Sequence, residues 1–138
     1  GQPLVLWSIP PSSELLHWLV ESAAPSAIYL CGQLTSDDSA PGVVRQVGAL
    51  CNYALARDGR LDLARMAARL GVTERVIRTA LLCLARRGLI DLLRIARGSG
   101  SPDWERARQR YTELADQLTE VRAWRRFFLR ARLSELGV

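Results

Sequence analysis

The 138-residue chain contains no lysine and one histidine, only three cysteines, and no long apolar run. A structural zinc site needs four nitrogen or sulfur ligands at short paired spacings, and Cys31, Cys51, Cys83 and His17 form no such pairs. Each cysteine falls inside an apolar pattern, which predicts three small buried side chains in a reducing cytoplasm. Because no segment approaches the ~20 apolar residues of a membrane span, we expect no membrane partner.

The sequence also lacks a glycine-rich loop after its first apolar run, which argues against nucleotide binding. His17 has no evident carboxylate or nucleophile partner, so we expect a partly exposed helix residue rather than a general base. With no nucleophile–base pair and no metal cluster, we expect neither a catalytic residue nor a cofactor in this chain. The start Gly1-Gln2-Pro3, without methionine, predicts an excised piece of a longer protein.

Charge is distributed unevenly along the chain. All 19 basic residues are arginine, a composition typical of a GC-rich genome. Residues 1–40 hold four carboxylates and no arginine, a net charge of −4, whereas residues 41–138 hold 19 arginines and ten carboxylates, a net charge of +9. This asymmetry predicts that affinity for polyanions is confined to residues 41–138. Many of these arginines are equally expected on a solvated helix surface.

The first forty residues predict a βαβ unit. The apolar run Pro3–Ile9 is too short for a helix and predicts a buried strand, and Ser12 or Ser13 can cap the helix that follows. Ala24-Pro25 ends that helix, and Ala27–Cys31 is a second short apolar run. This order implies a parallel strand pair with a right-handed crossover. Since two parallel strands leave faces and edges uncovered, we expect the unit to pack against the helical part, and to continue an upstream sheet or pair with a second copy.

A helix-turn-helix signature occupies the middle of the chain. Leu61–Leu70 predicts a short helix, Gly71 suits a left-handed turn, and Thr73 can cap a second helix over Glu74–Arg87. The pattern LxxMAxxLGVT over residues 63–73, closed by Gly-Leu-Ile, is typical of helix-turn-helix modules. Winged-helix modules also dock proteins, so the pattern leaves DNA contact and protein docking open.

The wing and the last helix follow. Asp91–Ala96 predicts one strand, but Arg97–Ser101 leads directly into a helix, so we expect a truncated wing without a returning strand. Ser101-Pro102 is a favourable helix start, and no glycine or proline follows before Gly137, which predicts a single helix of about 35 residues. Its apolar residues repeat at a spacing that favours packing against another helix. These residues are Trp104, Ala107, Tyr111, Leu114, Leu118 and Val121.

The sequence therefore predicts a mostly helical α+β fold in three parts. Residues 1–40 form the βαβ unit, residues 41–100 the winged-helix-like helix-turn-helix, and residues 101–138 a long basic helix. The boundary after the first part is the polar stretch Leu34–Gly42, which an amphipathic helix over Val43–Leu55 follows.

Candidate nucleic-acid-binding residues lie in three places. In the second helix of the helix-turn-helix, an inward apolar stripe predicts that Glu74, Arg75, Arg78 and Thr79 face solvent. The truncated wing adds two arginines, and the end of the last helix interleaves arginines with aromatic residues that can stack bases. The candidates are Arg75, Arg78, Thr79, Arg94, Arg97, Arg122, Arg125 and Arg126. The aromatic residues at the helix end are equally expected to dock it on the βαβ unit.

Several segments carry a resemblance to a known family. They are the strand and turn Leu4–Ser12, the helix at Glu14–Leu16, Ala24-Pro25, the strand Ile28–Leu30, the helix-turn-helix Leu61–Ile90, and the closing Ala123–Phe128. Together they resemble the C-terminal accessory region of bacterial RecJ, the single-strand-specific 5′→3′ DNA exonuclease. The family's catalytic DHH motif, which binds manganese, has no counterpart here, so no catalytic or metal residue carries over.

The resemblance implies that a parent enzyme hydrolyses DNA in repair and recombination with manganese or magnesium. This chain would then be a cytoplasmic, non-catalytic accessory domain that binds single-stranded DNA, a DNA-repair protein or the rest of the parent nuclease. The alternative is a stand-alone winged-helix transcription regulator that forms a dimer through its last helix. A regulator is expected to prefer duplex DNA of defined sequence, whereas the accessory module is expected to be monomeric and indifferent to sequence. The truncated wing and the βαβ start favour the accessory module.

Overall fold

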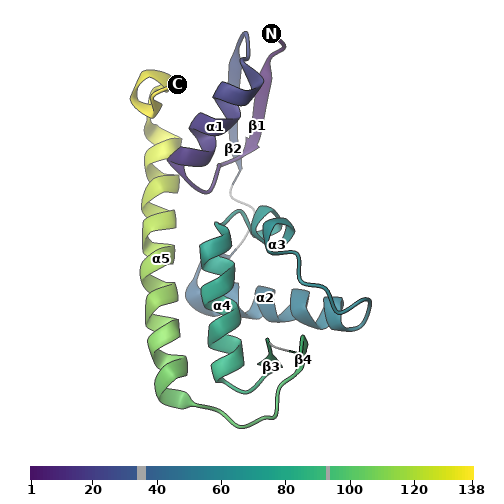
Figure 1. The fold of residues 1–138 in the computed structure, drawn as a ribbon. Coiled ribbons are helices and arrows are strands. Elements are labelled where there is room, and N and C mark those ends of the chain that lie inside the picture. The colour runs from purple at the N-terminus through teal and green to yellow at the C-terminus, as the bar shows by residue number, and fades with distance from the viewer. Residues whose placement is uncertain (34–36, 93) are drawn as a thin grey trace. The chain divides into compact units, whose positions relative to one another are not determined.

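A computed structural model describes residues 1–33, 37–92 and 94–138. These residues form five α-helices and two small two-stranded sheets, which confirms the predicted mostly helical α+β fold (Figure 1). The chain divides into two compact units, one formed by residues 1–36 with 120–138 and the other by residues 37–119. This division differs from the predicted three parts, because the last helix contributes to both units rather than forming a part of its own.

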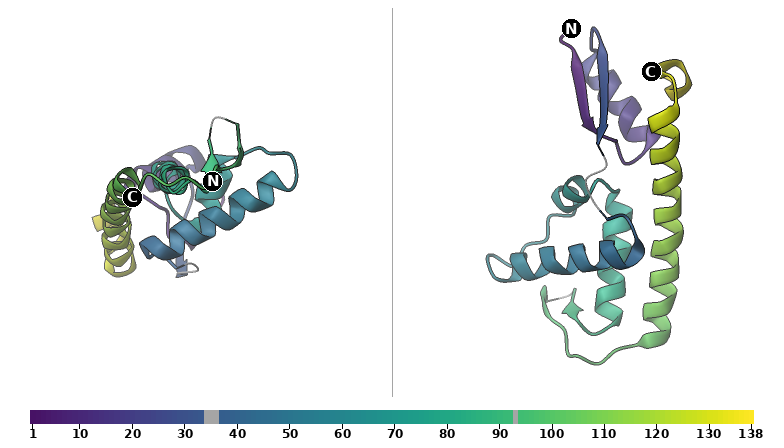
Figure 2. Two further views of the ribbon diagram at one scale, coloured as in Figure 1. Left: turned by 90° about the horizontal axis from the view of Figure 1, so that it is seen from below. Right: turned by 180° about the vertical axis from the view of Figure 1, so that it is seen from behind.

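The first unit contains the predicted βαβ arrangement. Strand β1 (Leu4–Ser8) pairs in parallel with β2 (Ile28–Gln33), and helix α1 (Ser13–Ala23) connects them along one face of the pair (Figures 1 and 2). The hydroxyl of Ser12 accepts the N–H of Leu15 at 3.3 Å and so caps α1. The parallel pairing and the serine cap are both confirmed.

The core of the first unit joins the sheet to the end of the last helix. Leu6, Leu16 and Phe128 are buried in one cluster, and Leu16 is fully enclosed. The indole N–H of Trp124 donates to the carbonyl of Pro10 at 2.6 Å. The expectation that the βαβ unit packs against helical residues is therefore confirmed for the residues of its own unit.

The opposite face of the β1–β2 sheet is open to solvent. Val5, Trp7 and Tyr29 are 42%, 69% and 58% exposed, and Val5 pairs directly with Tyr29 across the two strands. Cys31 is exposed on the same sheet, so the prediction that all three cysteines are buried is wrong for this one. The side chains of a strand alternate between the two faces of its sheet. The apolar run in the sequence did not indicate that one of these faces is uncovered.

The last helix, α5 (Trp104–Arg130), has 27 residues rather than about 35. It begins at Trp104 and not at the predicted Ser101-Pro102, and Asp103 caps it, because the carboxylate of Asp103 accepts the N–H of Arg106 at 3.1 Å. Its buried apolar residues follow the predicted spacing, although Trp104 and Tyr111 are exposed.

A short 3₁₀ helix, η1 (Leu133–Leu136), follows α5 in place of the predicted continuous helix. Glu135 reaches back and accepts the N–H of Arg132 at 2.6 Å. The turn buries Leu136 in the core of the first unit, and its carbonyl accepts the ring N–H of His17 at 2.9 Å. These contacts, rather than any local breaker residue, end α5.

The second unit is built on the helix-turn-helix. Its helices are α2 (Ala40–Leu55), α3 (Leu63–Leu70) and α4 (Glu74–Arg86), and Ser39 caps α2 (Figure 1). Residues 34–36 of the predicted boundary stretch lie outside the described residues. The apolar stripes of the three helices meet in one core. Its buried members include Val43, Val47, Cys51, Met66, Leu70, Ile77, Ala80, Leu81 and Leu84.

The turn between α3 and α4 has the predicted geometry. Gly71 adopts φ 64°, a left-handed conformation that glycine reaches without a steric penalty. The hydroxyl of Thr73 accepts the N–H of Val76 at 3.4 Å and caps α4. The predicted glycine turn and threonine cap are both confirmed.

The wing has a returning strand, so its predicted absence is wrong. Strand β3 (Ile90–Asp91) pairs in antiparallel fashion with β4 (Ala96–Arg97), where one continuous strand over Asp91–Ala96 was expected. Leu93, in the middle of that expected strand, lies outside the described residues. Each strand has only two residues, too few for an alternating pattern to be visible in the sequence. The wing is nevertheless short, as predicted.

Candidate nucleic-acid interface

The start of α4 presents charged residues to solvent. Glu74, Arg75 and Arg78 are exposed, as the apolar stripe of the helix predicts. Arg78 forms an ion pair with Glu74 at 3.5 Å, but both side chains are about half or more exposed, at 66% and 47%. An exposed pair of this kind is weak, so a phosphate group can compete with Glu74 for Arg78.

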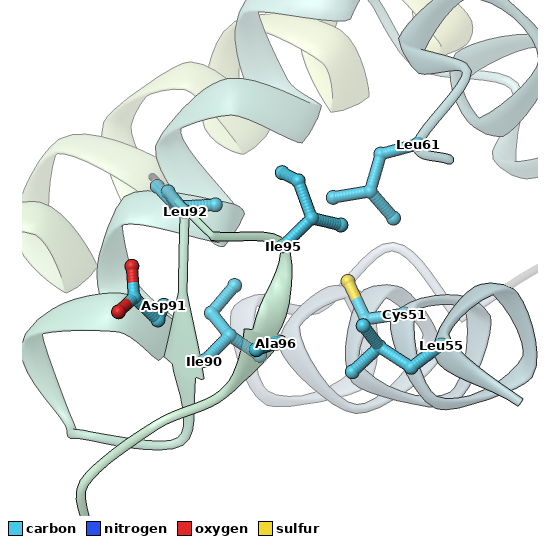
Figure 3. Close-up of a pocket in the computed structure, with 8 residues that line it drawn as sticks. All are labelled: Cys51, Leu55, Leu61, Ile90, Asp91, Leu92, Ile95 and Ala96. Atoms are coloured by element: carbon cyan, nitrogen blue, oxygen red, sulfur yellow. The ribbon is translucent and has the colours of Figure 1, made fainter. Parts of the chain in front are cut away.

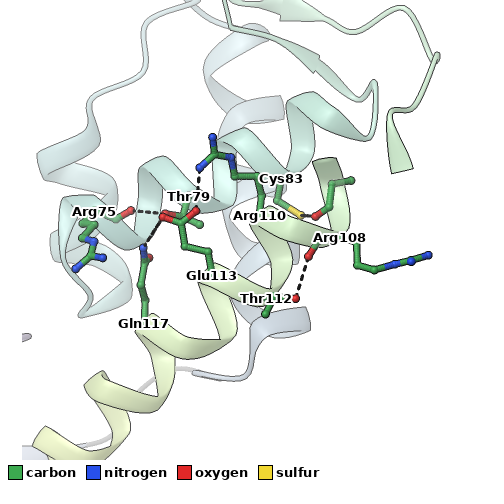
Figure 4. Close-up of polar contacts among 9 residues, drawn as sticks. Arg75, Thr79, Cys83, Arg108, Arg110, Thr112, Glu113 and Gln117 are labelled. Carbon is green, nitrogen blue, oxygen red and sulfur yellow. Dashed lines mark hydrogen bonds and ion pairs between the residues drawn. The ribbon is translucent and has the colours of Figure 1, made fainter. Parts of the chain in front are cut away.

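Thr79 was predicted to face solvent, and this prediction is wrong. Its side chain is buried, with 4% of its surface exposed. The hydroxyl donates to the carbonyl of Arg75 at 3.1 Å and accepts the amide N–H of Gln117 at 3.0 Å (Figure 4). The first half of α5 packs along this flank of α4, a contact that the apolar stripe of α4 alone does not reveal.

A second contact lies one turn further along the same flank. The thiol of Cys83 donates to the carbonyl of Ala107 at 3.8 Å (Figure 4). Because α5 covers the flank that holds Thr79 and Cys83, the freely exposed residues of α4 are concentrated in its first turns. A recognition helix reads bases along its exposed face, and here that face is short.

Two exposed arginines on α3 were missed by the sequence reasoning. Arg65 and Arg69 are one helical turn apart, and Arg69 lies in the last turn before Gly71. In the part of the chain that the structure describes, neither of them nor Arg75 forms an ion pair with a carboxylate. The available signal was their i, i+4 spacing, on the side of α3 away from its buried stripe Met66, Ala67 and Leu70.

The wing arginines are exposed, as expected. The side chain of Arg94 is 84% exposed and lies 3.9 Å from the carboxylate of Asp91, which also accepts the backbone N–H of Arg94. Arg97 is exposed on β4. Both side chains are available to a phosphate backbone.

The arginines near the end of α5 differ in accessibility. Arg126 is exposed, Arg122 is half-buried, and Arg125 is buried, with 6% of its surface exposed. Arg122 and Arg125 already interact with other groups of the chain. Arg125 is therefore a poor candidate for phosphate binding.

The aromatic residues of this cluster are held within the first unit. The ring of Trp124 contacts Phe127 in a tilted arrangement and Phe128 edge-on, with ring centroids 6.0 Å and 5.9 Å apart. Because Trp124 bonds Pro10 and Phe128 is buried, these two rings dock the helix end on the βαβ unit, as the alternative interpretation held.

A cavity beside the wing, lined by Cys51, Leu61 and Ile95 among others, has a volume of about 10 Å³, room for about one water molecule (Figure 3). Burial raises the pKa of the Cys51 thiol and so disfavours the nucleophilic thiolate. Among the described residues, no group of three or more His, Cys, Asp or Glu side chains could hold a metal ion.

None of the described helices is both long and apolar enough to cross a bilayer. Comparison of the chain with known protein families, with curated proteins and with solved structures finds no match. The resemblance to the RecJ accessory region therefore stays a prediction, and function is inferred from the geometry of the site.

Proposed function

We propose that this chain is a non-catalytic accessory module whose helix-turn-helix binds the phosphate backbone of DNA without reading its sequence. One observation carries the proposal. Arg65 and Arg69 on α3 and Arg75 and Arg78 on α4 are exposed on either side of a single turn, within 14 consecutive positions. Arginines clustered on one element are the electrostatic footprint of nucleic-acid binding.

The composition of α4 favours sequence-indifferent binding. Its exposed first turn contains Glu74, which repels phosphate, and the flank that holds Thr79 and Cys83 is turned toward α5. Phosphate contacts position a protein on DNA, whereas base contacts specify the sequence. A surface with four arginines and few other exposed polar side chains supplies the first kind of contact.

The same proposal includes a place for the module. We propose that it assists a RecJ-like single-strand-specific exonuclease in repair and recombination, with the manganese or magnesium chemistry in another part of that enzyme. The combination of a βαβ unit with a helix-turn-helix, together with the resemblance, supports this assignment.

The alternative is a regulator that forms a dimer through α5. Such a dimer needs the apolar seam of α5 to be free, but Leu114 and Leu118 are fully buried within the single chain. The burial of this seam favours a monomeric module, and light scattering of the purified protein distinguishes the two.

Fluorescence anisotropy with labelled dT30 and a mixed-sequence 30-base-pair duplex tests the proposal. We expect the variant Arg75→Ala/Arg78→Ala, and separately Arg65→Ala/Arg69→Ala, to weaken binding of dT30 several-fold. Each double variant removes two phosphate contacts, so the log–log salt slope should fall in magnitude by about 1.4 on single strands. Melting temperatures should hardly change, because exposed arginines contribute little to folding.

The matched control is Arg106→Ala/Arg108→Ala, which removes the same charge from the first turns of α5. These turns lie near the opposite end of α4, where the N–H of Asp103 donates to the carbonyl of Arg86. An equal loss of affinity in the control would show that the helix-turn-helix variants act only through net charge. Unchanged affinity in both helix-turn-helix variants, or binding insensitive to salt, would reject the nucleic-acid interface.

A further inference from the structure

A separate groove lies in the second unit, at the end away from the helix-turn-helix arginines. It has a volume of about 610 Å³ and is lined by α2, the C-terminal end of α4, the turn that follows α4, and one residue of α5. The residues that matter for its chemistry are Arg45, Gly48, Leu84, Arg87, Leu89 and Tyr111.

The groove is distinct from the arginines of the helix-turn-helix. Arg87 follows Arg75 by 12 positions along α4 and its C-terminal cap, a separation of about 18 Å at 1.5 Å per residue. One surface can therefore be altered without touching the other.

The floor of the groove is apolar. Val44 and Leu84 are buried beneath it, whereas Leu89 and Tyr111 remain 50% and 37% exposed at its sides. Exposed apolar side chains gathered around a depression mark a binding surface rather than a solvated one.

The walls of the groove are basic. Arg45 stands on α2 and Arg87 at the end of α4, and the lining includes no carboxylate among the described residues. Asp37 lies outside the lining; its carboxylate accepts the N–H of Ser39 at 3.0 Å and offsets part of the charge of Arg45. The groove thus combines an apolar floor with positive charge on two sides.

We propose that this groove binds an acidic segment of a partner protein, with apolar side chains of the segment seated on Leu84 and Leu89 and its carboxylates facing Arg45 and Arg87. Charge complementarity selects an acidic occupant, and the aliphatic floor selects apolar anchors. Most lining residues are exposed or half-exposed, so the groove is too open to enclose a small molecule. Stacking of bases on aromatic side chains strengthens grooves that bind single strands, whereas Tyr111 is the only aromatic residue in the lining described and the floor is aliphatic.

Gly48 allows the groove to be filled without disturbing the core. A Cβ atom at Gly48 would meet only the methyl groups of Leu84, at 3.9 Å, which is ordinary van der Waals contact. Alanine and leucine both favour a helix interior over glycine. Gly48→Leu should therefore occupy the groove, and Gly48→Ala is the control that leaves it open.

The probe is a fluorescein-labelled 14-residue peptide with Leu or Phe at every third or fourth position and Glu or Asp elsewhere. Two twin peptides replace either the acidic residues by Lys or the apolar residues by Ala. We expect the parent peptide to bind at least tenfold more tightly than either twin. Gly48→Leu and Arg45→Glu/Arg87→Glu should each weaken it at least tenfold, whereas Gly48→Ala should not.

A reciprocal comparison separates this proposal from the DNA-binding one. Arg65→Glu/Arg69→Glu should weaken binding of dT30 and leave the peptide unaffected, and the groove variants should do the reverse. Amide chemical shifts of Gly48 and Leu89 should move on addition of the peptide.

Three results would overturn the proposal. The first is equal binding of the three peptides, and the second is undiminished peptide binding by both groove variants. The third is a loss of dT30 binding, rather than of peptide binding, in those variants. The last result would make the groove a nucleic-acid surface.

Discussion

The three cysteines of this chain lie in different surroundings. Cys51 and Cys83 are buried in the second unit, and desolvation raises the pKa of both thiols. The nearby charge of Arg87 opposes this rise in the pKa of Cys83 but does not cancel it. Cys31 is exposed on the β1–β2 sheet. Accessibility and the thiolate fraction, which a raised pKa reduces at neutral pH, both control thiol reactivity.

We expect one thiol per native chain to react rapidly with Ellman's reagent at pH 7.5. The reactive group should be Cys31, and Cys31→Ser should abolish the rapid phase. All three thiols should react in guanidinium chloride. Rapid labelling of the native Cys31→Ser protein would show that Cys51 or Cys83 is accessible.

Residue-level predictions succeeded where local periodicity determines the environment. Arg75 and Arg78 had to be outward because Val76 and Ile77 had to be inward. The same reasoning failed for Thr79 and Cys31. Thr79 is buried by a contact with a segment far away in the sequence, and Cys31 is exposed because no such segment among the described residues covers it. No local pattern records that Gln117 bonds Thr79.

Helices α4 and α5 are joined by that buried polar contact. The amide N–H of Gln117 donates to Thr79 at 3.0 Å and, less favourably, to Glu113 at 3.4 Å. Its carbonyl oxygen is buried with no hydrogen-bond partner among the described residues. A buried polar group without a partner lowers stability, so this contact fixes how α5 lies on α4 more than it stabilises the unit.

A double-mutant cycle tests this interpretation. Thr79→Val alone should lower the free energy of unfolding by about 1–3 kcal/mol, because it leaves the amide of Gln117 poorly paired. The double variant Thr79→Val/Gln117→Leu should recover most of that loss, since both polar partners are then removed. Urea denaturation measures the four free energies, and additive losses would contradict the expected coupling.

Helices with a capping or helix-breaking residue at each end were predicted well. Helices α1, α3 and α4 each start at a residue whose side chain caps the first turn, and α3 ends at Gly71. Strand β4 and the end of α5 were not predicted. The two-residue β4 exists through its pairing with β3, and α5 stops where Leu136 enters the core of the first unit.

At the scale of the whole molecule, the first unit depends on residues from both ends of the chain. Its core takes Leu6 and Leu16 from the βαβ segment and Phe128 and Leu136 from the C-terminal segment. The second unit, by contrast, consists of the continuous residues 37–119.

We therefore expect a chain of residues 37–138 to lose the helical structure beyond Glu120, because Phe128 and Leu136 would be exposed to water. Circular dichroism at 222 nm should show this loss, together with a lower melting temperature. As a matched test, Leu16→Ala in the full chain should cost about 2–5 kcal/mol by leaving a cavity in the same core. A shortened chain that melts like the full chain would mean that residues 1–36 add no stability.

The contact between Trp124 and Pro10 has an optical consequence. Trp7, Trp18 and Trp104 are 69%, 59% and 60% exposed, so their emission already reports water in the folded protein. Trp124 alone is half-buried with its N–H bonded to a carbonyl. Replacing the three exposed indoles by phenylalanine, each a surface change of small energetic effect, would leave one fluorophore whose emission maximum follows the opening of a single core.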